Sequence, residues 1–284
     1  MIKIITDSTS DLDIEDAKEM DIEIVPLKVI IDGQEYKDRV DLQPHQFYEL
    51  LKNSDVLPTT SQPSPQDFLT IYENAKKNKE EVLVITLSSQ VSGTYQSACI
   101  AKDLAEYDNI YVLDSYNATH GLNLLVRKAV ALKNEGKSLD EIISILEEYK
   151  QRIHIYAVVD TLEYFYKGGR LSKTSVIAGS LLKFKPVVGL KDGTLALFTK
   201  ARGVQKATMK IIELIHEHGD IDFNEPVSIG YTGSHLGSEK FEDILRQEFP
   251  FQEVFHGCVG PVIGTHAGPE ARLIAYIAQH KNAK

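Results

Sequence analysis

Hydroxyl-bearing side chains are concentrated in residues 88–98, which read SSQVSGTYQSA and follow the apolar run VLVITL. The pattern predicts a helix that begins near Ser92, a residue type favoured at helix N-termini. Gly93 would let the backbone approach a ligand closely. The free N–H groups of a first helical turn attract anions. The stretch therefore suits either a simple helix cap or part of a cradle for an anionic ligand.

Three further polar loops precede or follow predicted elements, and they read TDSTSD at 6–11, TTSQPS at 59–64 and GPVIGTHAGPEA at 260–271. Loops at the carboxyl ends of parallel strands gather at one sheet edge, where ligands usually bind. Thr60 and Ser61 carry exposed hydroxyls just before a predicted helix. Turn and capping chemistry explains either hydroxyl loop alone. Two such loops at one sheet edge favour a shared polar site.

Two basic side chains could complete such a site. His266 lies in a glycine-rich loop, and Arg202 is flanked by Ala201 and Gly203. An arginine and a histidine that converge with hydroxyl groups bind a carboxylate through charge-assisted hydrogen bonds. A phosphorylated ligand would be expected to recruit more lysine and arginine.

Other chemistries have weaker sequence support. A hydrolase or acyltransferase that uses Ser92 with His266 is the main alternative, but the GxSxG elbow is absent. A sugar- or phosphate-binding regulator is a third, disfavoured by few cations near the hydroxyl loops and by the lack of tryptophan. No dinucleotide fingerprint occurs, and His216 and His218 would point to nearly opposite sides of a helix. We therefore predict neither a metal nor a cofactor. The acidic cluster Asp7, Asp11, Asp13 and Asp16 could suggest a Mg²⁺ site, but we favour Ser10 or Asp11 as the cap of the first helix, with acids in its first turn.

Strands and helices alternate through the first half of the chain. Apolar, β-branched runs predict strands at 2–6, 23–31, 82–87, 110–114 and 155–160, and helical patterns cover 13–20, 44–53, 64–78, a segment from near 92, 121–136 and 138–151. This alternation predicts a largely parallel sheet with helices on both faces.

The second half begins with a strand, an Asp192-Gly193 turn and a second strand, which is a hairpin signature. Helices are predicted at 203–218 and 236–249 and within 269–280, with strands near 226–233 and 252–257. The fold class is therefore α/β with two α/β domains, residues 1–155 with a largely parallel sheet and residues 156–284 with a mixed one.

Composition narrows the range of partners. The chain has 284 residues, 43% of them hydrophobic, and a net charge of -10. That charge argues against nucleic acid and against attachment to an anionic membrane surface. Residues 1–11 lack the apolar segment of a signal peptide, no run is long enough to insert stably in a membrane, and the two cysteines are far apart. We therefore expect a cytoplasmic protein.

Seven motifs in order along the chain resemble the DegV family: TDSTSDL at 6–12, TTSQPS at 59–64, LSSQVSGTYQSA at 87–98, KGGRLS at 167–172, LLKFKPVV at 181–188, KAR at 200–202 and GPVIGTHAGP at 260–269. The resemblance implies a non-catalytic protein that binds one long-chain fatty acid between two α/β domains. It also implies the lipid-presenting subunit of the bacterial fatty acid kinase system. A separate kinase subunit would phosphorylate the bound acid for phospholipid synthesis.

The same resemblance assigns roles to individual residues. Thr60 and Ser92 would contact the carboxylate, Ser61 and Gly93 would lie beside them, and Arg202 and His266 would complete the polar end. One departure concerns Glu270, which follows Pro269 where the family usually has small residues. A glutamate turned toward the pocket would repel a carboxylate.

The acyl tail needs an apolar tunnel. Burial of about 14 methylenes at roughly 0.8 kcal/mol each gives about 11 kcal/mol, against an association cost of about 4–15 kcal/mol. The tunnel candidates are Phe165, Ile177, Leu181, Leu182 and Phe184, although ordinary core packing is the more common role of such residues.

A basic segment suggests where a partner would dock. Residues 164–191 contain basic but no acidic side chains, and among them we assign Lys167, Arg170 and Lys173 to a surface that meets an acidic face of the kinase subunit. The glycines at 168 and 169 would end a short helix. Charge reversal at Arg170 is expected to weaken kinase coupling and to leave lipid binding intact.

Overall fold

The computed structural model describes residues 1–54, 56–171 and 184–280, and its first sheet is parallel throughout. The strands run in the order β2-β1-β6-β7, and their bounds are β1 (Ile2–Asp7), β2 (Ile22–Val25), β6 (Glu81–Thr86) and β7 (Ile110–Asp114). Helices α3 (Pro65–Asn78) and α4 (Thr94–Ala105) pack on the β6–β7 part of this sheet, and α1 (Ile14–Glu19) lies beside β2.

The second sheet has six described strands in the order β10-β9-β8-β13-β11-β12. Their bounds are β8 (Ile153–Val158), β9 (Lys185–Lys191), β10 (Thr194–Ala201), β11 (Val227–Tyr231), β12 (Val254–Cys258) and β13 (Arg272–Ile277). Strands β11 and β12 are parallel and the other neighbours antiparallel. Helices α9 (Val204–His218) and α10 (Ser238–Glu248) pack against it. The α/β class, with a parallel first sheet and a mixed second one, is confirmed.

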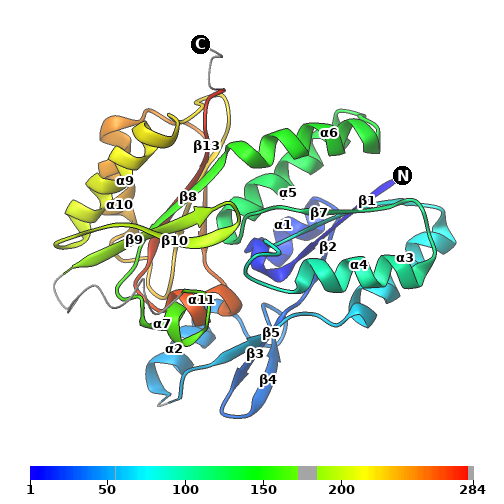
Figure 1. Cartoon of the computed structure of the whole chain (residues 1–284), viewed down its shortest axis with the longest axis horizontal. Helices are drawn as coiled ribbons and strands as arrows, with labels where there is room; N and C mark the ends of the chain where they lie inside the picture. Colours follow the sequence, from blue (N-terminus) through cyan, green and yellow to red (C-terminus); the bar gives the residue numbers. More distant parts are fainter. Residues whose placement is uncertain (55, 172–183, 281–284) are drawn as a thin grey trace.

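Helix α5 (Thr119–Asn134) joins the two sheets, and α6 (Leu139–Tyr149) packs beside it. Figure 1 shows the resulting layers, from α9 and α10 through the six-stranded sheet and α5 to the parallel sheet and α3 and α4. One apolar cluster that includes Leu83, Leu125 and Ala275 crosses from sheet to sheet. The predicted domain boundary at 155/156 falls inside β8, the first strand of the second sheet, and the division into two domains stays a prediction.

A small antiparallel sheet lies below the parallel one in Figure 1 and contains β3 (Lys28–Ile31), β4 (Gln34–Lys37) and β5 (Thr59–Ser61). We predicted a single strand over 23–31, but the structure has β2 and β3 in different sheets with Pro26 between them. Proline lacks the N–H that a continuous ladder needs. Helix α2 (Pro44–Asn53) follows β4. The small sheet positions β5, which carries Thr60 and Ser61.

The predicted last helix is wrong. Residues 272–277 form β13, which is buried throughout, whereas the preceding loop contains helix α11 (Pro261–Ala267). A short, fully buried apolar run has no one-sided periodicity, so a strand and a helix look alike in sequence. The hairpin is confirmed, since Asp192 and Gly193 both have positive φ, as its tight turn requires. Helix α7 (Glu163–Lys167) ends at Gly168, as predicted, and short 3₁₀ turns cover Ser8–Ser10 and Lys150–Arg152.

Candidate functional site

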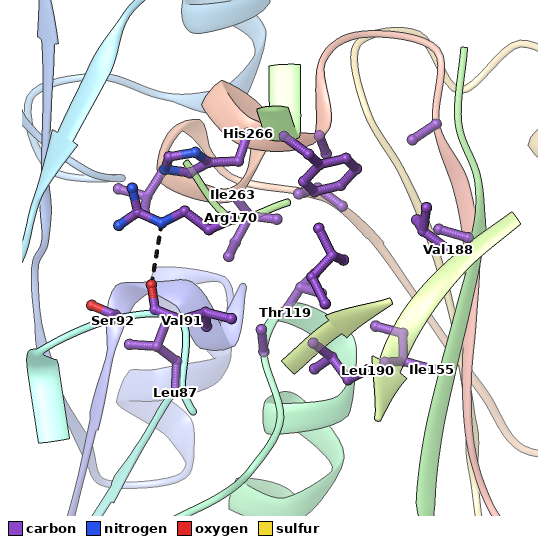
Figure 2. A pocket seen from close by; sticks show the side chains of 18 of the residues that line it. Leu87, Val91, Ser92, Thr119, Ile155, Arg170, Val188, Leu190, Ile263 and His266 are labelled. Carbon is purple, nitrogen blue, oxygen red and sulfur yellow. Dashed lines mark hydrogen bonds between the residues drawn. The ribbon is translucent and has the colours of Figure 1, made fainter. Parts of the chain in front are cut away.

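A cavity of about 320 Å³ lies where the parallel sheet, the six-stranded sheet and the small sheet meet. Its volume is within the usual range for ligand pockets, roughly 300–1,000 Å³. Most of its wall is apolar, and its polar side chains are Thr60, Ser61, Gln62, Ser92, Thr119, Arg170, Thr232 and His266. Figure 2 shows His266, Arg170 and Ser92 on one side and Ile155, Val188 and Leu190 on the other. The cavity therefore has a polar end and an apolar end.

Thr60 and His266 form a direct contact at the polar end. Thr60 Oγ1 lies 2.8 Å from His266 Nε2, across more than 200 residues of sequence. Strand β5 presents Thr60 and helix α11, which packs against β3 and β5, presents His266. Burial, and secondarily the charge of Arg170, lowers the pKa of His266 to about 4. The imidazole is therefore neutral at pH 7, and its buried Nδ1 has no hydrogen-bond partner among the described residues.

Arg170 is half-buried and lines the cavity. Its Nε donates to the Val91 carbonyl at 3.2 Å, drawn dashed in Figure 2, and its Nη1 donates to the Gly168 carbonyl at 2.7 Å. These two acceptors hold the guanidinium between the end of α7 and the loop before α4. Sequence reasoning placed Arg170 on a partner surface. The structure puts it at the polar end, where it supplies a cation.

Arg202, the arginine predicted for this end, does not line the cavity that the described residues form. Its side chain is exposed, with the guanidinium carbon 5.7 Å from the ring centre of Phe184. The sequence showed two arginines near glycines, and nothing in their spacing distinguished which one faces inward.

The two hydroxyl loops meet at the cavity. Ser92 lines it, and its Oγ contacts Thr94 Oγ1 at 3.0 Å. Gly93 is the N-cap residue of α4 and is not part of the lining. A Cβ on Gly93 would lie 2.0 Å from Gln62 Oε1, and the Gln62 amide donates to Ser97 Oγ at 2.9 Å. The loop after β5 is thus held directly against the start of α4.

The structure separates the remaining predicted residues. Phe165 lines the cavity, Phe184 does not, and Lys167 is exposed and pairs with Glu163 at 2.6 Å. Ile177, Leu181, Leu182 and Lys173 lie outside the described residues. Glu270 is exposed, lines a neighbouring pocket and contacts Arg272 at 3.4 Å. It therefore does not place a negative charge in the cavity.

The apolar wall includes residues that sequence reasoning did not single out: Leu27, Ile155, Val188, Leu190, Ile263 and Leu273. They come from strands β8, β9 and β13, from helix α11 and from the segment between β2 and β3. Val188 and Ile263 fall within the motifs at 181–188 and 260–269, but an apolar residue in a buried element has no feature that distinguishes a cavity wall from ordinary core. The signal that could have identified Arg170 is the KGGRLS motif, which was assigned to the surface.

The N-terminal acids form a buried network instead of the predicted cap. Asp13 is the N-cap residue of α1, so neither Ser10 nor Asp11 caps that helix. Asp11 accepts hydrogen bonds from Arg39 Nη2 at 3.2 Å, Thr119 Oγ1 at 2.6 Å and the Gly260 N–H at 2.8 Å. Thr119 lines the cavity, and Gly260 begins the helix that carries His266. The network therefore fixes elements that build the site.

Two more carboxyl groups lie close to this network. Burial, and secondarily the charge of Asp11, raises the pKa of Asp38 to about 8. Burial raises the pKa of Asp7 to about 6, although hydrogen bonds from Thr9 and Leu87 oppose the shift. Ser8 Oγ donates to Asp38 Oδ2 at 2.9 Å.

Neither a catalytic pair nor a metal centre is evident in the part of the chain that the structure describes. Ser92 contacts Thr94 and His266 contacts Thr60, so these hydrogen bonds do not join the two candidate catalytic residues to each other. No group of three or more histidine, cysteine, aspartate or glutamate side chains is arranged to hold a metal within residues 1–54, 56–171 and 184–280. No helix among those residues is long and apolar enough to cross a membrane.

The chain matches a known protein family over nearly its whole length. A family model described as "Uncharacterised protein, DegV family" matches residues 1–279. A DegV domain-containing protein of Caldanaerobacter subterraneus is 41% identical over 271 residues, which cover 95% of this chain and 96% of that one.

Two solved structures are similar to this chain in fold. DegV of Bacillus subtilis, described as a fatty acid binding protein, has a TM-score of 0.85 at 33% identity and covers 98% of this chain and 99% of its own. A stearic acid-binding protein of Eubacterium ventriosum has a TM-score of 0.90 at 28% identity, with 98% of each chain covered. The chain described here belongs to the DegV family.

Proposed function

We propose that this chain binds one long-chain fatty acid in the cavity, with the carboxylate at the polar end. The observation that carries the proposal is the one-sided polarity of the cavity, where the Thr60–His266 pair and Arg170 lie opposite an apolar wall. The solved relatives support it, since the Bacillus subtilis protein is described as fatty acid binding and the Eubacterium ventriosum protein as stearic acid binding.

The polar groups suit a carboxylate in number and chemistry. Arg170 is a permanent cation, Ser92 and Thr60 each have a hydroxyl, and His266 lines the cavity beside Thr60. Hydrogen bonds to a charged group contribute about 1.5–3 kcal/mol each, so they orient the headgroup. Most of the binding free energy comes from burying the tail, at about 0.8 kcal/mol per methylene.

We propose further that the protein is a non-catalytic, cytoplasmic subunit that presents its fatty acid to a separate kinase subunit. The kinase would form the acyl phosphate for phospholipid synthesis, as the family resemblance implies. Because Arg170 lines the cavity, Arg170→Glu is expected to weaken lipid binding as well as any docking. Exposed Lys167 is therefore the better probe of a partner surface.

Lys167→Glu tests this presentation role directly. The variant should keep its fatty acid in native mass spectrometry and lose acyl phosphate formation with the kinase subunit from the same bacterium. Full phosphorylation with Lys167→Glu would remove this residue from the docking surface. Hydrolysis of acyl esters by the purified chain, abolished in Ser92→Ala without loss of ligand, would support the alternative enzyme.

The binding proposal is tested by a matched pair of variants on strand β5. Thr60 lines the cavity, whereas adjacent Thr59 is exposed and does not. Thr60→Val removes the hydroxyl and keeps the shape, and it should weaken octadecanoate binding by about 10- to 150-fold. Thr59→Val makes the same chemical change outside the cavity and should leave binding unchanged.

Native mass spectrometry of the purified protein, followed by organic extraction, identifies any retained acid, and a titration gives the affinities of both variants. A wild-type chain that carries no adduct and takes up no added hexadecanoate or octadecanoate would overturn the proposal. Equal affinities of the two threonine variants would remove Thr60 from the headgroup site.

A further inference from the structure

A second pocket, of about 500 Å³, lies beside the apolar end of the cavity. It is formed where the β9–β10 turn approaches the loops that follow β6 and β7, and its lining includes Gln90, Tyr116, His154, Tyr156, Lys191 and Phe198. Leu190 lines both this pocket and the cavity. It is the residue that the two linings share within the part of the chain that the structure describes.

The ladder between strands β8 and β9 ends beside this pocket. The register between β8 and β9 covers Tyr156–Val158 and Val187–Gly189 and ends at the Tyr156–Gly189 pair. Both strands continue past it, β8 back to Ile153 and β9 on to Lys191. The backbones are in close contact where pairing ends, since a Cβ on Gly189 would lie 2.3 Å from the Ile155 carbonyl oxygen. Beyond this point the register has no further β8–β9 pair among the described residues.

The hairpin turn is held in this position from the other sheet. Ser88 Oγ, in the loop after β6, donates to the Gly193 carbonyl at 2.8 Å. A Cβ on Gly193 would lie 2.5 Å from the same Ser88 oxygen, so only glycine permits this contact. The turn is thereby fixed to the first sheet while β9 separates from β8.

Part of the wall of the second pocket, on the opposite face of β9 from the Leu190 side chain, is suited to hydrocarbon. The rings of Tyr156 and Phe198 meet edge to face at a centroid separation of 5.2 Å, and Ile153 adds an aliphatic surface. Exposed Lys191 and Asp192 line the pocket at the turn. A methylene chain would thus be buried near the rings and would lose that burial at the charged rim.

We propose that Leu190 separates the fatty acid cavity from this pocket and sets the preferred chain length, and that longer acyl chains extend their methyl end past Leu190 toward Phe198. The proposal rests on the function proposed above. Each methylene that becomes buried raises affinity about fourfold, so two that pass the partition change a preference by more than tenfold.

The first test compares two leucine-to-alanine variants on the same hairpin. Leu190 lies in both linings, whereas Leu195 lies only in that of the cavity. The protein is stripped of lipid and offered an equimolar mixture of hexadecanoate, octadecanoate and docosanoate, and native mass spectrometry reports the occupancy of each. In Leu190→Ala the docosanoate to hexadecanoate ratio should rise about tenfold over wild type, and in Leu195→Ala it should change less than threefold.

An unchanged ratio in Leu190→Ala, or an equal rise in both variants, would overturn the proposal. A wild-type chain that binds none of the three acids would instead contradict the proposed function, so the two failures are distinguishable. The ratio is measured within one sample, and therefore a general loss of affinity does not alter it.

The second test locates the methyl end directly and leaves Leu190 intact. The chain has no tryptophan, so Phe198→Trp introduces a single reporter in the second pocket. Docosanoate with a terminal bromine should quench its fluorescence, and the corresponding bromododecanoate should not. Phe223→Trp, at an exposed position outside both linings, controls for collisional quenching. Equal quenching by the two acids, or none by the longer one when bound, would refute passage past Leu190.

Discussion

Removal of the Asp11 carboxylate should destabilise the protein far more than removal of its neighbour on the same arginine. Arg39 donates to Asp11 at 3.2 Å and to Asp13 at 3.1 Å, yet the Asp11 side chain is 0% exposed and that of Asp13 is 72% exposed. Burial raises the pKa of Asp11, but Arg39, Thr119 and the Gly260 N–H all favour the carboxylate. The two aspartates therefore differ in burial and partners while sharing one cation.

The magnitude follows from what each substitution leaves behind. Asp11→Ala removes the buried carboxylate partner of Arg39, whose side chain is only 6% exposed, and leaves it with Asp13 and the Cys258 carbonyl. It also removes the acceptor of Thr119 and of the Gly260 N–H. Breaking a buried pair in this way costs about 3–5 kcal/mol. Asp13→Ala removes an exposed partner and should cost about 0–1 kcal/mol. With a urea slope of about 3 kcal/mol per molar, Asp11→Ala lowers the midpoint by about 1–2 M.

Urea unfolding followed by circular dichroism at pH 7 measures both variants. If Asp11→Ala costs no more than Asp13→Ala, the carboxylate is not the centre of the network. The same samples should show weaker octadecanoate binding in Asp11→Ala, because Thr119 and Gly260, the N-cap residue of α11, lose their common acceptor. Normal lipid affinity in a destabilised Asp11→Ala would separate the network from the site.

Three further outcomes follow from the same geometry. Burial raises the pKa of Asp38 to about 8, so the folded chain holds this proton more tightly than the unfolded chain, and the contribution of Asp38 to stability declines as pH rises from about 4 through 8. Asp38→Asn should therefore flatten the pH dependence of the urea midpoint over that range. An unchanged slope would contradict this. Gly260→Ala should lower the thermal midpoint several degrees more than Gly93→Ala. The new Cβ at 260 would lie 2.8 Å from Asp11 Oδ1, whereas the one at 93 would meet only the movable end of Gln62. Equal shifts would argue against close packing at Gly260. A bound carboxylate should raise the pKa of His266 from about 4, because its negative charge favours the imidazolium. Histidine NMR titrations with and without octadecanoate measure this change. The ring signals of exposed His45 should not respond to the ligand.

Local patterns in the sequence predicted most of the framework. Helix α2 and strand β7 have the predicted bounds, because their apolar periodicity and flanking residues agree. The prediction of a helix at the end of the chain was wrong because β13 is buried on both faces, so its apolar and polar residues do not alternate. The strand over 23–31 was too long because Pro26 moves the chain from one sheet to another.

The site was less predictable because its residues converge only through tertiary contacts. Hydroxyl loops could be grouped from their place after strands, and the structure brings Thr60, Ser92 and His266 to one cavity. The choice between Arg170 and Arg202 depends on which arginine finds backbone acceptors. Arg170 has the Gly168 carbonyl, two residues away, and the Val91 carbonyl, which a distant segment supplies. The KGGRLS motif marks Arg170, but no local pattern contains its contact with the Val91 carbonyl.

The charges in the cavity bear on which anion it can hold. Among its described lining residues Arg170 alone has a permanent charge, since the pKa of His266 is near 4. A carboxylate brings one negative charge, which Arg170 balances, whereas a phosphate group brings about 1.5–2. The excess charge would be buried without a partner unless His266 took up a proton. The charge of the described lining therefore fits the proposed carboxylate better than a phosphate group, and in the proposed kinase system the same mismatch would favour release of the acyl phosphate once it forms.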